Sequence, residues 1–240
     1  MAWFFATVLK MHRMIVNERA FFIEDLKAVV IADIHLGYEL ELREAGINIR
    51  NQTFHLKNTL KKIISETDAE RVIIVGDVKH NITGPTKALQ DFFENLDVEI
   101  IAVKGNHDGN LEEFVDFKVY PPTGIRIGKY GFFHGHCWPD EDVMRAKYVF
   151  MGHLHPEIAL TDSIGKVHKY PCHLLGTLND AGKKKFGSDP KLFVISAFNP
   201  LVGSALGTPI GPIFKNGLVE DMDVYLLNGV YLKKYSISAD

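Results

Sequence analysis

Seven of the eleven histidines lie in five short polar clusters, and each cluster follows an apolar run. The clusters also contain aspartates and an asparagine, whose oxygens could bind a cation beside the imidazoles. In chain order the clusters are Asp33-Ile34-His35, Gly76-Asp77-Val78-Lys79-His80, Gly105-Asn106-His107-Asp108, His134-Gly135-His136 and Gly152-His153-Leu154-His155. Ligand sites of open α/β sheets lie beyond the carboxyl ends of the strands. We therefore expect five strand ends to bring these clusters together at one edge of a sheet.

The spacing within the clusters supports a shared site. Asp33 and His35 are two residues apart, and so are His153 and His155. Side chains two apart on a strand share a face, so each pair could point at one ion or straddle two. A glycine opens three of the clusters, and glycine suits a sharp exit from a strand where the backbone passes close to a ligand.

The donor atoms are carboxylate oxygens, one amide oxygen and imidazole nitrogens, without a thiolate. This set suits borderline divalent ions, with Mn favoured and Zn, Fe, Ni or Co as alternatives. Two such ions next to Asp33 and Asp77 leave a charge of about +2, which favours hydroxide and an anionic substrate such as phosphate. A metal pair about 3.5–4 Å apart generates hydroxide and stabilises in-line displacement at phosphorus. The expected reaction is hydrolysis of a phosphoester by metal-activated hydroxide attacking in line.

The elements that must position these clusters are visible in the pattern of apolar residues. Short apolar runs predict strands at Lys27–Ile34, Arg71–Val75, Val98–Val103, Lys129–Phe133 and Lys147–Met151. Apolar residues spaced by three and four predict helices at Asn51–Ser65 and Pro85–Leu96. This alternation predicts a largely parallel sheet in the first half. From Tyr120 onward strand and turn chemistry dominates, which predicts a second sheet. The expected fold is α/β with two sheets, forming one domain over residues 1–240.

The composition is that of an ordinary globular protein, with 46% hydrophobic and 24% charged residues. This excludes a disordered, collagen-like or coiled-coil chain. Lys+Arg 27 against Asp+Glu 30 gives a net charge of −3, which argues against binding nucleic acid by bulk charge. Cys137 and Cys172 form no disulfide-rich or zinc-finger pattern, so we expect a cytoplasmic protein. The apolar stretch Met1–Leu9 is too short to span a bilayer, so no membrane partner is expected, and a homo-oligomer stays open.

The five clusters, in this order, resemble the motifs of the calcineurin-like metallophosphoesterases: DxH, GDxxH, GNH(D/E), H and GHxH. The longer strings ADIHLGYE at Ala32–Glu39 and GDVKH at Gly76–His80 resemble the archaeal ICC-like phosphoesterases, which are related to the SbcD nuclease. The resemblance extends from about Lys27 to His155. It implies an α-β-β-α sandwich of the metallophosphoesterase type. It also favours phosphodiesters, including nucleic acid or nucleotides, as substrates.

The resemblance further implies a role for each matching residue. One ion would be held by Asp33, His35 and His155, and the other by Asn106, His134 and His153. Asp77 would bridge the two ions. His107 would protonate the leaving group or donate to the developing charge on phosphorus. His80 would steady His107 or touch the phosphate, and His136 would support the ligand His134.

Other residues near the clusters have plainer interpretations. Asp108 could cap a helix that begins near Leu111 or support the site, and Lys79 is placed to contact a phosphate. The run Lys183–Lys185 is expected to be a solvated loop. Tyr38 and Trp138 could stack on a base, although packing is favoured. The histidines outside the clusters are expected to be structural or exposed: His12, His55, His168 and His173.

Two other functions stay open at this point. A phosphomonoesterase or nucleotide phosphatase would use the same metal chemistry on a different ester. A non-enzymatic protein-interaction scaffold would use the same fold, but such a protein would be expected to lack ligands. No position of the ligand pattern is missing from this sequence.

Overall fold

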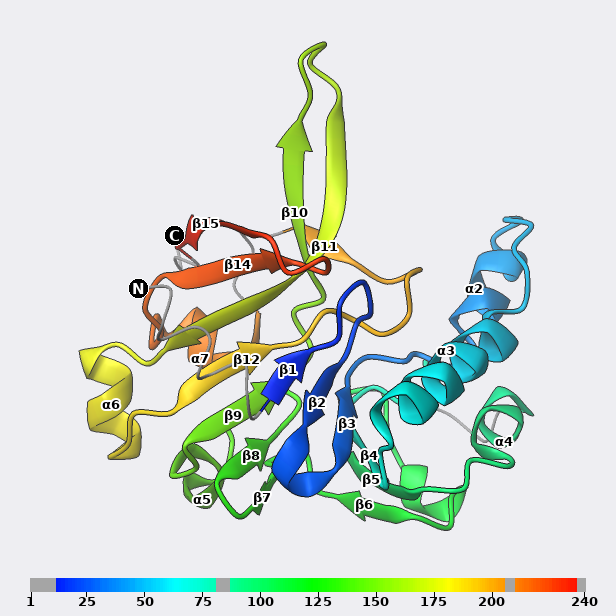
Figure 1. Ribbon diagram of the computed structural model, residues 1–240, viewed down its shortest axis with the longest axis horizontal. Helices are drawn as coiled ribbons and strands as arrows, with labels where there is room; N and C mark the ends of the chain where they lie inside the picture. Colours follow the sequence, from blue (N-terminus) through cyan, green and yellow to red (C-terminus); the bar gives the residue numbers. More distant parts are fainter. Residues whose placement is uncertain (1–11, 81–86, 206–209, 237–240) are drawn as a thin grey trace.

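The computed structural model describes residues 12–80, 87–205 and 210–236, which form two facing β-sheets (Figure 1). The first sheet has the strand order β1-β2-β3-β4-β5-β6. Its strands are β1 His12–Met14, β2 Phe21–Ile23, β3 Ala28–Ile31, β4 Arg71–Val75, β5 Glu99–Val103 and β6 Lys118–Tyr120. Strands β3 to β6 pair in parallel, whereas β1 and β2 are antiparallel additions. The largely parallel sheet predicted for the first half is confirmed.

Helices α3 Gln52–Thr67 and α4 Lys87–Phe93 and the 3₁₀ turn η2 Leu111–Glu113 cover the outer face of this sheet (Figure 1). Helix α2 Tyr38–Glu44 is largely exposed, and the 3₁₀ turn η1 Glu24–Leu26 joins β2 to β3. Helix α3 begins where the Asn51 side chain accepts a hydrogen bond from the Thr53 N–H. Pro85, the predicted start of the next helix, lies outside the described residues. The pattern of apolar residues did not reveal α2, because this helix is too short and exposed to bury an apolar stripe.

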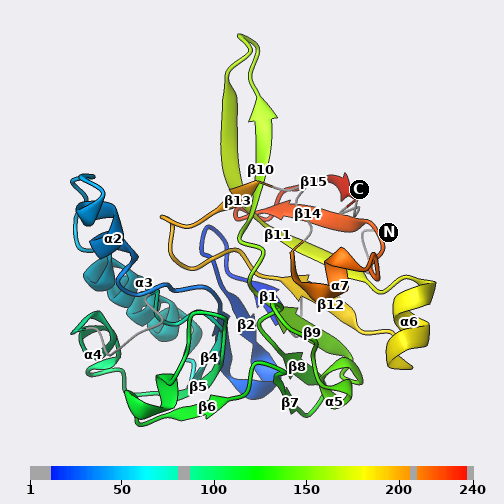
Figure 2. The ribbon, with the colours of Figure 1, turned by 180° about the vertical axis from the view of Figure 1, so that it is seen from behind.

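The second half adds the expected second sheet, with the strand order β13-β10-β11-β12-β9-β8-β7 and with β14 and β15 joined to β11. Its strands are β7 Ile125–Ile127, β8 Tyr130–Phe132, β9 Tyr148–Met151, β10 Pro156–Thr161, β11 Val167–Thr177, β12 Lys191–Val194, β13 Ser204–Ala205, β14 Met222–Leu226 and β15 Tyr231–Tyr235. Strands β8, β9 and β12 are parallel. The hairpin of β10 and β11 projects from the body (Figures 1 and 2).

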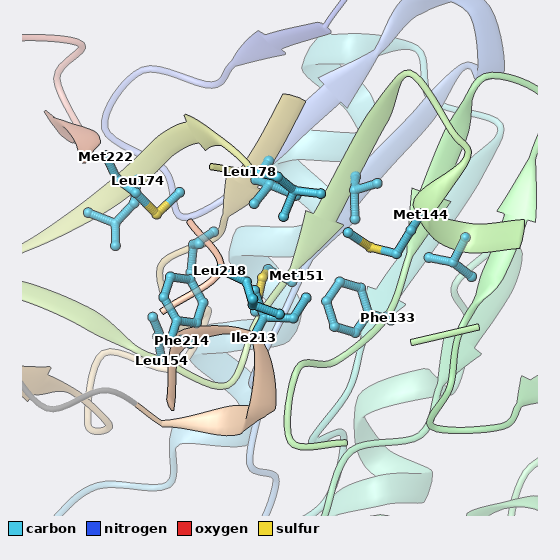
Figure 3. Packing of buried hydrophobic residues seen from close by; sticks show 14 of the residues in the cluster. Phe133, Met144, Met151, Leu154, Leu174, Leu178, Ile213, Phe214, Leu218 and Met222 are labelled. Atoms are coloured by element: carbon cyan, nitrogen blue, oxygen red, sulfur yellow. The ribbon is translucent and has the colours of Figure 1, made fainter. Parts of the chain in front are cut away.

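Three short helices pack on the second sheet: α5 Glu141–Met144, α6 Asp180–Phe186 and α7 Gly211–Lys215. The expectation of a loop at Lys183–Lys185 is wrong, because these lysines form the last turn of α6. Cations are favoured there by the negative end of the helix dipole. Figure 3 shows Ile213 and Phe214 of α7 packed beside Leu154 and Met151 in the core on this face.

The four layers, helix–sheet–sheet–helix, follow from three separate apolar clusters. One lies between the first sheet and its helices, and one between the second sheet and its own. The third fills the space between the sheets, where Phe21 of β2 packs edge-on against Phe150 of β9 and Phe193 of β12. The central strands β3, β4, β9 and β12 are therefore buried on both faces, and the polar clusters are left at the strand ends.

Candidate metal centre

The polar clusters lie beyond the carboxyl ends of five strands, but these strands belong to two sheets. Three clusters follow β3, β4 and β5 of the first sheet, and two follow β8 and β9 of the second. The expectation of one edge of a single sheet is therefore wrong in this respect. The edges of the two facing sheets meet instead, and the His153 N–H donates to both carboxylate oxygens of Asp33 at 3.2 and 3.1 Å.

Five of the predicted ligands have left-handed backbone conformations. The φ angles are 56° at Asp33, 45° at His35, 49° at Asp77, 71° at His153 and 44° at His155. Such angles are uncommon for residues with a side chain and cost about 1–3 kcal/mol each. The argument that residues two apart share a strand face is therefore wrong here, because β3 ends at Ile31 and β9 at Met151. Left-handed turns bring these side chains together instead.

The glycines that open three clusters are required by close contacts. A Cβ atom on Gly76 would lie 2.1 Å from Nδ1 of His134, and one on Gly105 would lie 2.1 Å from Oδ1 of Asp77. A Cβ on Gly152 would lie 2.7 Å from Oδ2 of Asp33. The backbone of each cluster therefore packs against a ligand side chain from another cluster, as the sequence predicted.

The first group of candidate ligands contains Asp33, His35, Asp77 and His155, whose donor atoms all lie within 4.8 Å of one another. Nε2 of His155 lies 3.2 Å from Oδ1 of Asp33 and 3.4 Å from Nε2 of His35. Nε2 of His35 lies 3.5 Å from Oδ2 of Asp77. Nitrogen and oxygen lone pairs that converge this closely suit a cation between them.

The second group contains Asp77, His134 and His153, again within 4.8 Å. Nε2 of His134 lies 3.3 Å from Oδ2 of Asp77 and 3.2 Å from Oδ1 of Asn106, so the asparagine adjoins this group. Asp77 is common to both groups. The residues therefore fit two adjacent divalent ions of the borderline class, with nitrogen and oxygen donors and no sulfur.

The charges in this buried site depend on one another. Burial opposes a charge on His134, but the facing carboxylates of Asp77 and Asp33 outweigh it and raise the pKa to about 9. Burial lowers the pKa of His35 to about 4 and of His153 to about 3. Burial also disfavours ionised Asp77, yet the neighbouring imidazoles hold its pKa well below the usual range. Ionised carboxylates and neutral imidazoles are the forms that bind metals, so His134 would release a proton when an ion binds.

His134 and His107 are each oriented by a backbone carbonyl. Nδ1 of His134 donates to the Val75 carbonyl at 3.1 Å, which leaves Nε2 facing Asp77 and Asn106. Nδ1 of His107 donates to the His80 carbonyl at 2.7 Å. A carbonyl can only accept, so Nε2 of His107 is the atom left to exchange a proton with a substrate.

His80 contacts His107, as one of the two roles expected for it requires, and that role stays a prediction. Its carbonyl holds Nδ1 of His107, and the two rings stack with centroids 5.2 Å apart and planes 19° apart. Its own ring contacts His35 and packs on Tyr38. Nε2 of this ring donates a hydrogen bond to the carboxylate of Glu41 on α2. Glu41 was not found from the sequence, because 39 residues separate it from its partner and no motif includes it.

Asp108 is not a helix cap. The turn η2 is preceded by Asn110 and has no side-chain cap. The buried carboxylate of Asp108 instead accepts from three backbone N–H groups, those of Gly105, Val78 and Lys79, at 2.8, 3.2 and 3.1 Å. It therefore ties the loop after β4 to the loop after β5, which carry Asp77 and Asn106.

The remaining candidates differ in how close they lie to the site. The Lys79 ammonium is buried, donates to the Gly109 carbonyl at 2.6 Å and lies over the Phe114 ring, so its side chain occupies the interior rather than a phosphate-binding position. His136 is half-buried, with its ring 5.2 Å from that of His134, so it flanks the second group.

The aromatic residues next to the clusters and the histidines outside the clusters lie outside both ligand groups. Tyr38 packs on His80, and Trp138 lies under the Lys185 ammonium at 4.0 Å. His168 is paired with Asp162 on the projecting hairpin, and His173 is buried between the sheets. His55 is exposed, and the side chain of His12 lies outside what the structure describes. Within the described ranges, no helix has the length and apolar character that crossing a bilayer demands.

Comparisons with solved structures concern the fold of the chain. A nuclease from Pseudomonas putida, MPE, has a similar structure, with a TM-score of 0.62 and 19% sequence identity over 91% of this chain and 94% of that chain. YfcE, a phosphoesterase from E. coli, is a more distant match, with a TM-score of 0.41 and 15% identity over 88% of this chain and 99% of that chain. Curated protein sequences yielded no match.

The assignment of the chain to a family comes from the sequence. Residues 26–157, more than half of the chain, match the family model of the calcineurin-like phosphoesterases. This range begins just before β3, ends just after His155 and so contains every candidate ligand described above. The resemblance seen in the five motifs is confirmed, and the chain belongs to the calcineurin-like phosphoesterase family.

Proposed function

We propose that this protein hydrolyses phosphodiesters with two divalent metal ions, most readily manganese. The observation that carries the proposal is the pair of ligand groups that share Asp77. Asp33, His35 and His155 would hold one ion with Asp77, and Asn106, His134 and His153 would hold the other. When bound, such ions activate water and neutralise negative charge on the phosphoryl group.

The chain's own residues supply the proton and the scaffold. His107 is held by its Nδ1 against the His80 carbonyl, so Nε2 can carry a proton for the leaving oxygen. The His107 N–H also donates to Oδ1 of Asp77 at 2.9 Å, which ties the proposed acid to the shared ligand. Asp108 keeps the two loops that carry these residues in register. The acid therefore has a defined place beside the metal groups.

The preference for diesters has a separate basis. The motifs resemble those of SbcD-related phosphoesterases, and a solved structure with the same fold is that of a nuclease. The net charge of −3 argues against binding of long duplexes by bulk charge. We therefore favour short or single-stranded nucleic acid, or nucleotides, as substrates. Both cysteines are free, in keeping with the cytoplasmic location that we propose.

The test begins with the metal content of the purified protein, measured by plasma mass spectrometry. Turnover of bis(p-nitrophenyl) phosphate, p-nitrophenyl phosphate and single-stranded DNA and RNA is then measured with Mn, Zn, Ni and Mg. We expect two ions per chain and cleavage of the diesters, fastest with Mn. Turnover of the monoester alone would overturn the diester assignment, and a protein that binds metal without cleaving any ester would overturn hydrolysis.

The His107→Ala variant tests the proposed acid. We expect it to keep its metal ions but to lose about 10²–10⁴-fold in turnover, the usual contribution of general acid–base catalysis. His168→Ala is the matched control, because this histidine lies on β11 in the projecting hairpin, where it pairs with Asp162 and contacts the ring of Tyr170. Turnover of His107→Ala at the control rate would remove His107 from the mechanism.

A further inference from the structure

Glu41 forms the outer end of a chain of hydrogen bonds that reaches a candidate metal ligand. It lies on α2, and its side chain is 65% exposed. Its Oε2 lies 2.7 Å from Nε2 of His80, and Nδ1 of His80 lies 3.2 Å from Nδ1 of His35. The chain therefore runs from solvent through a largely buried imidazole to the first ligand group.

The hydrogen positions along this chain follow from donor and acceptor chemistry. A carboxylate only accepts, so Nε2 of His80 carries the hydrogen that is donated to Glu41. A neutral His80 then has a lone pair on Nδ1 and must accept from Nδ1 of His35. This places the hydrogen of His35 on Nδ1 and leaves its Nε2 with a lone pair. That Nε2 is the atom that faces His155 and Asp77.

The opposite arrangement would block the site. With its hydrogen on Nδ1, His80 would donate to His35, and His35 would then carry its own hydrogen on Nε2, between the other ligands. Packing alone does not prevent this arrangement. The rings of Tyr38 and His107 hold the plane of His80, with centroids at 4.6 and 5.2 Å, but both tautomers have the same shape. Among the described residues, the Glu41 carboxylate is the partner that distinguishes them.

We propose that Glu41 is a positioning residue that fixes the tautomers of His80 and His35 and so prepares His35 to bind metal. The proposal rests on the proposed function only in taking His35 as a ligand. Partners that orient a metal-binding histidine typically contribute 10–100-fold to metal affinity or activity. The family motifs do not include Glu41, because it acts through His80 and not on the ion.

The experiment compares Glu41→Ala and Glu41→Gln with Glu44→Ala. Glu44 lies on the same helix and is exposed, so its loss controls for charge and for helix propensity. Binding of Mn²⁺ to the metal-depleted full-length chain is measured by isothermal titration calorimetry. We expect Glu41→Ala to weaken binding about 10–100-fold, with an unchanged melting temperature. Glu41→Gln should fall between, because its amide can also donate and tolerates either tautomer.

A second readout does not depend on affinity or turnover. Side-chain ¹H–¹⁵N spectra of the metal-depleted proteins report which nitrogen of each histidine carries hydrogen. We expect His35 to change from the Nδ1–H form toward the Nε2–H form in Glu41→Ala and to stay unchanged in Glu44→Ala. Unchanged His35 signals, or Mn²⁺ affinity equal to that of the control, would overturn the proposal even if the protein hydrolyses diesters. A wild type without turnover, combined with the expected affinity loss, would instead reject the proposed function alone.

Discussion

His134 and His173 are both completely buried, yet their surroundings shift their pKa in opposite directions. At the metal centre, facing carboxylates overcome the effect of burial and raise the pKa of His134 to about 9. Between the sheets, burial lowers the pKa of His173 to about 3. There the imidazole packs edge-on against Phe21, and Nδ1 accepts from the Ser196 N–H at 3.1 Å.

The difference shows what distinguishes a histidine of the candidate metal centre from a structural one in this fold. Burial is the same in the two places and so cannot be the criterion. The centre around His134 gathers carboxylates at left-handed turns, whose backbone strain is maintained by the surrounding structure. His173 instead packs on Phe21, and the nearby positive charge of Arg19 lowers its pKa further. Convergence of charge, rather than burial, therefore marks the site.

The largest expected effect comes from Asp77→Asn, which removes the charge on which the comparison rests. We expect the variant to lose metal from both groups, because both contain Asp77. In the metal-depleted variant the pKa of His134 should fall toward that of His173, since burial then acts with less opposition. Metal analysis and NMR titration of the histidines measure the two effects. Asp221→Asn, at an exposed carboxylate, is the control, and loss of only one ion would contradict the shared role of Asp77.

An intermediate effect is expected from Gly76→Ala, which pushes a methyl group against His134. The position has a φ of +82°, and the new Cβ would meet Nδ1 of His134 at 2.1 Å. Left-handed strain and overpacking together should lower the free energy of unfolding by about 2–5 kcal/mol. Gly46→Ala is the matched control, because its φ is +83° with no neighbour within 4 Å, so only the strain of about 1–2 kcal/mol applies. Equal losses in urea unfolding would show that the contact with His134 is unimportant.

The smallest effect concerns His173→Gln and the dependence of stability on pH. The folded pKa of about 3 lies below the ordinary value of 6.5, so the unfolded chain binds more protons between these values. Stability from neutral His173 is complete above pH 6.5 and is lost as pH falls toward 3. From pH 7 to pH 5 the wild type should therefore lose about 2 kcal/mol more than the variant. Urea unfolding of both proteins at the two pH values tests this, and parallel losses would mean that His173 does not stay neutral.

Much of the first half could be read from the sequence, since strands buried on both faces must be continuous apolar runs. The run Arg71–Val75 is β4 without change, and Lys129–Phe133 differs from β8 by one residue at each end. Helix α2 was not predicted because it is short and exposed, and Glu41, which lies on this helix, was missed with it. The helical turn at Lys183–Lys185 was not predicted because three consecutive lysines show no periodic pattern of apolar residues.

Residue types and their order were enough to identify the family of this protein, because a family motif records which donors are present. They could not establish how the donors meet. The meeting of the two sheet edges at the site, the left-handed turns at Asp33 and His155, and the carboxylate of Glu41 behind His80 all depend on contacts between segments far apart in the chain. Such contacts arise only when the apolar layers pack, and so the tertiary structure alone decides the geometry of the site.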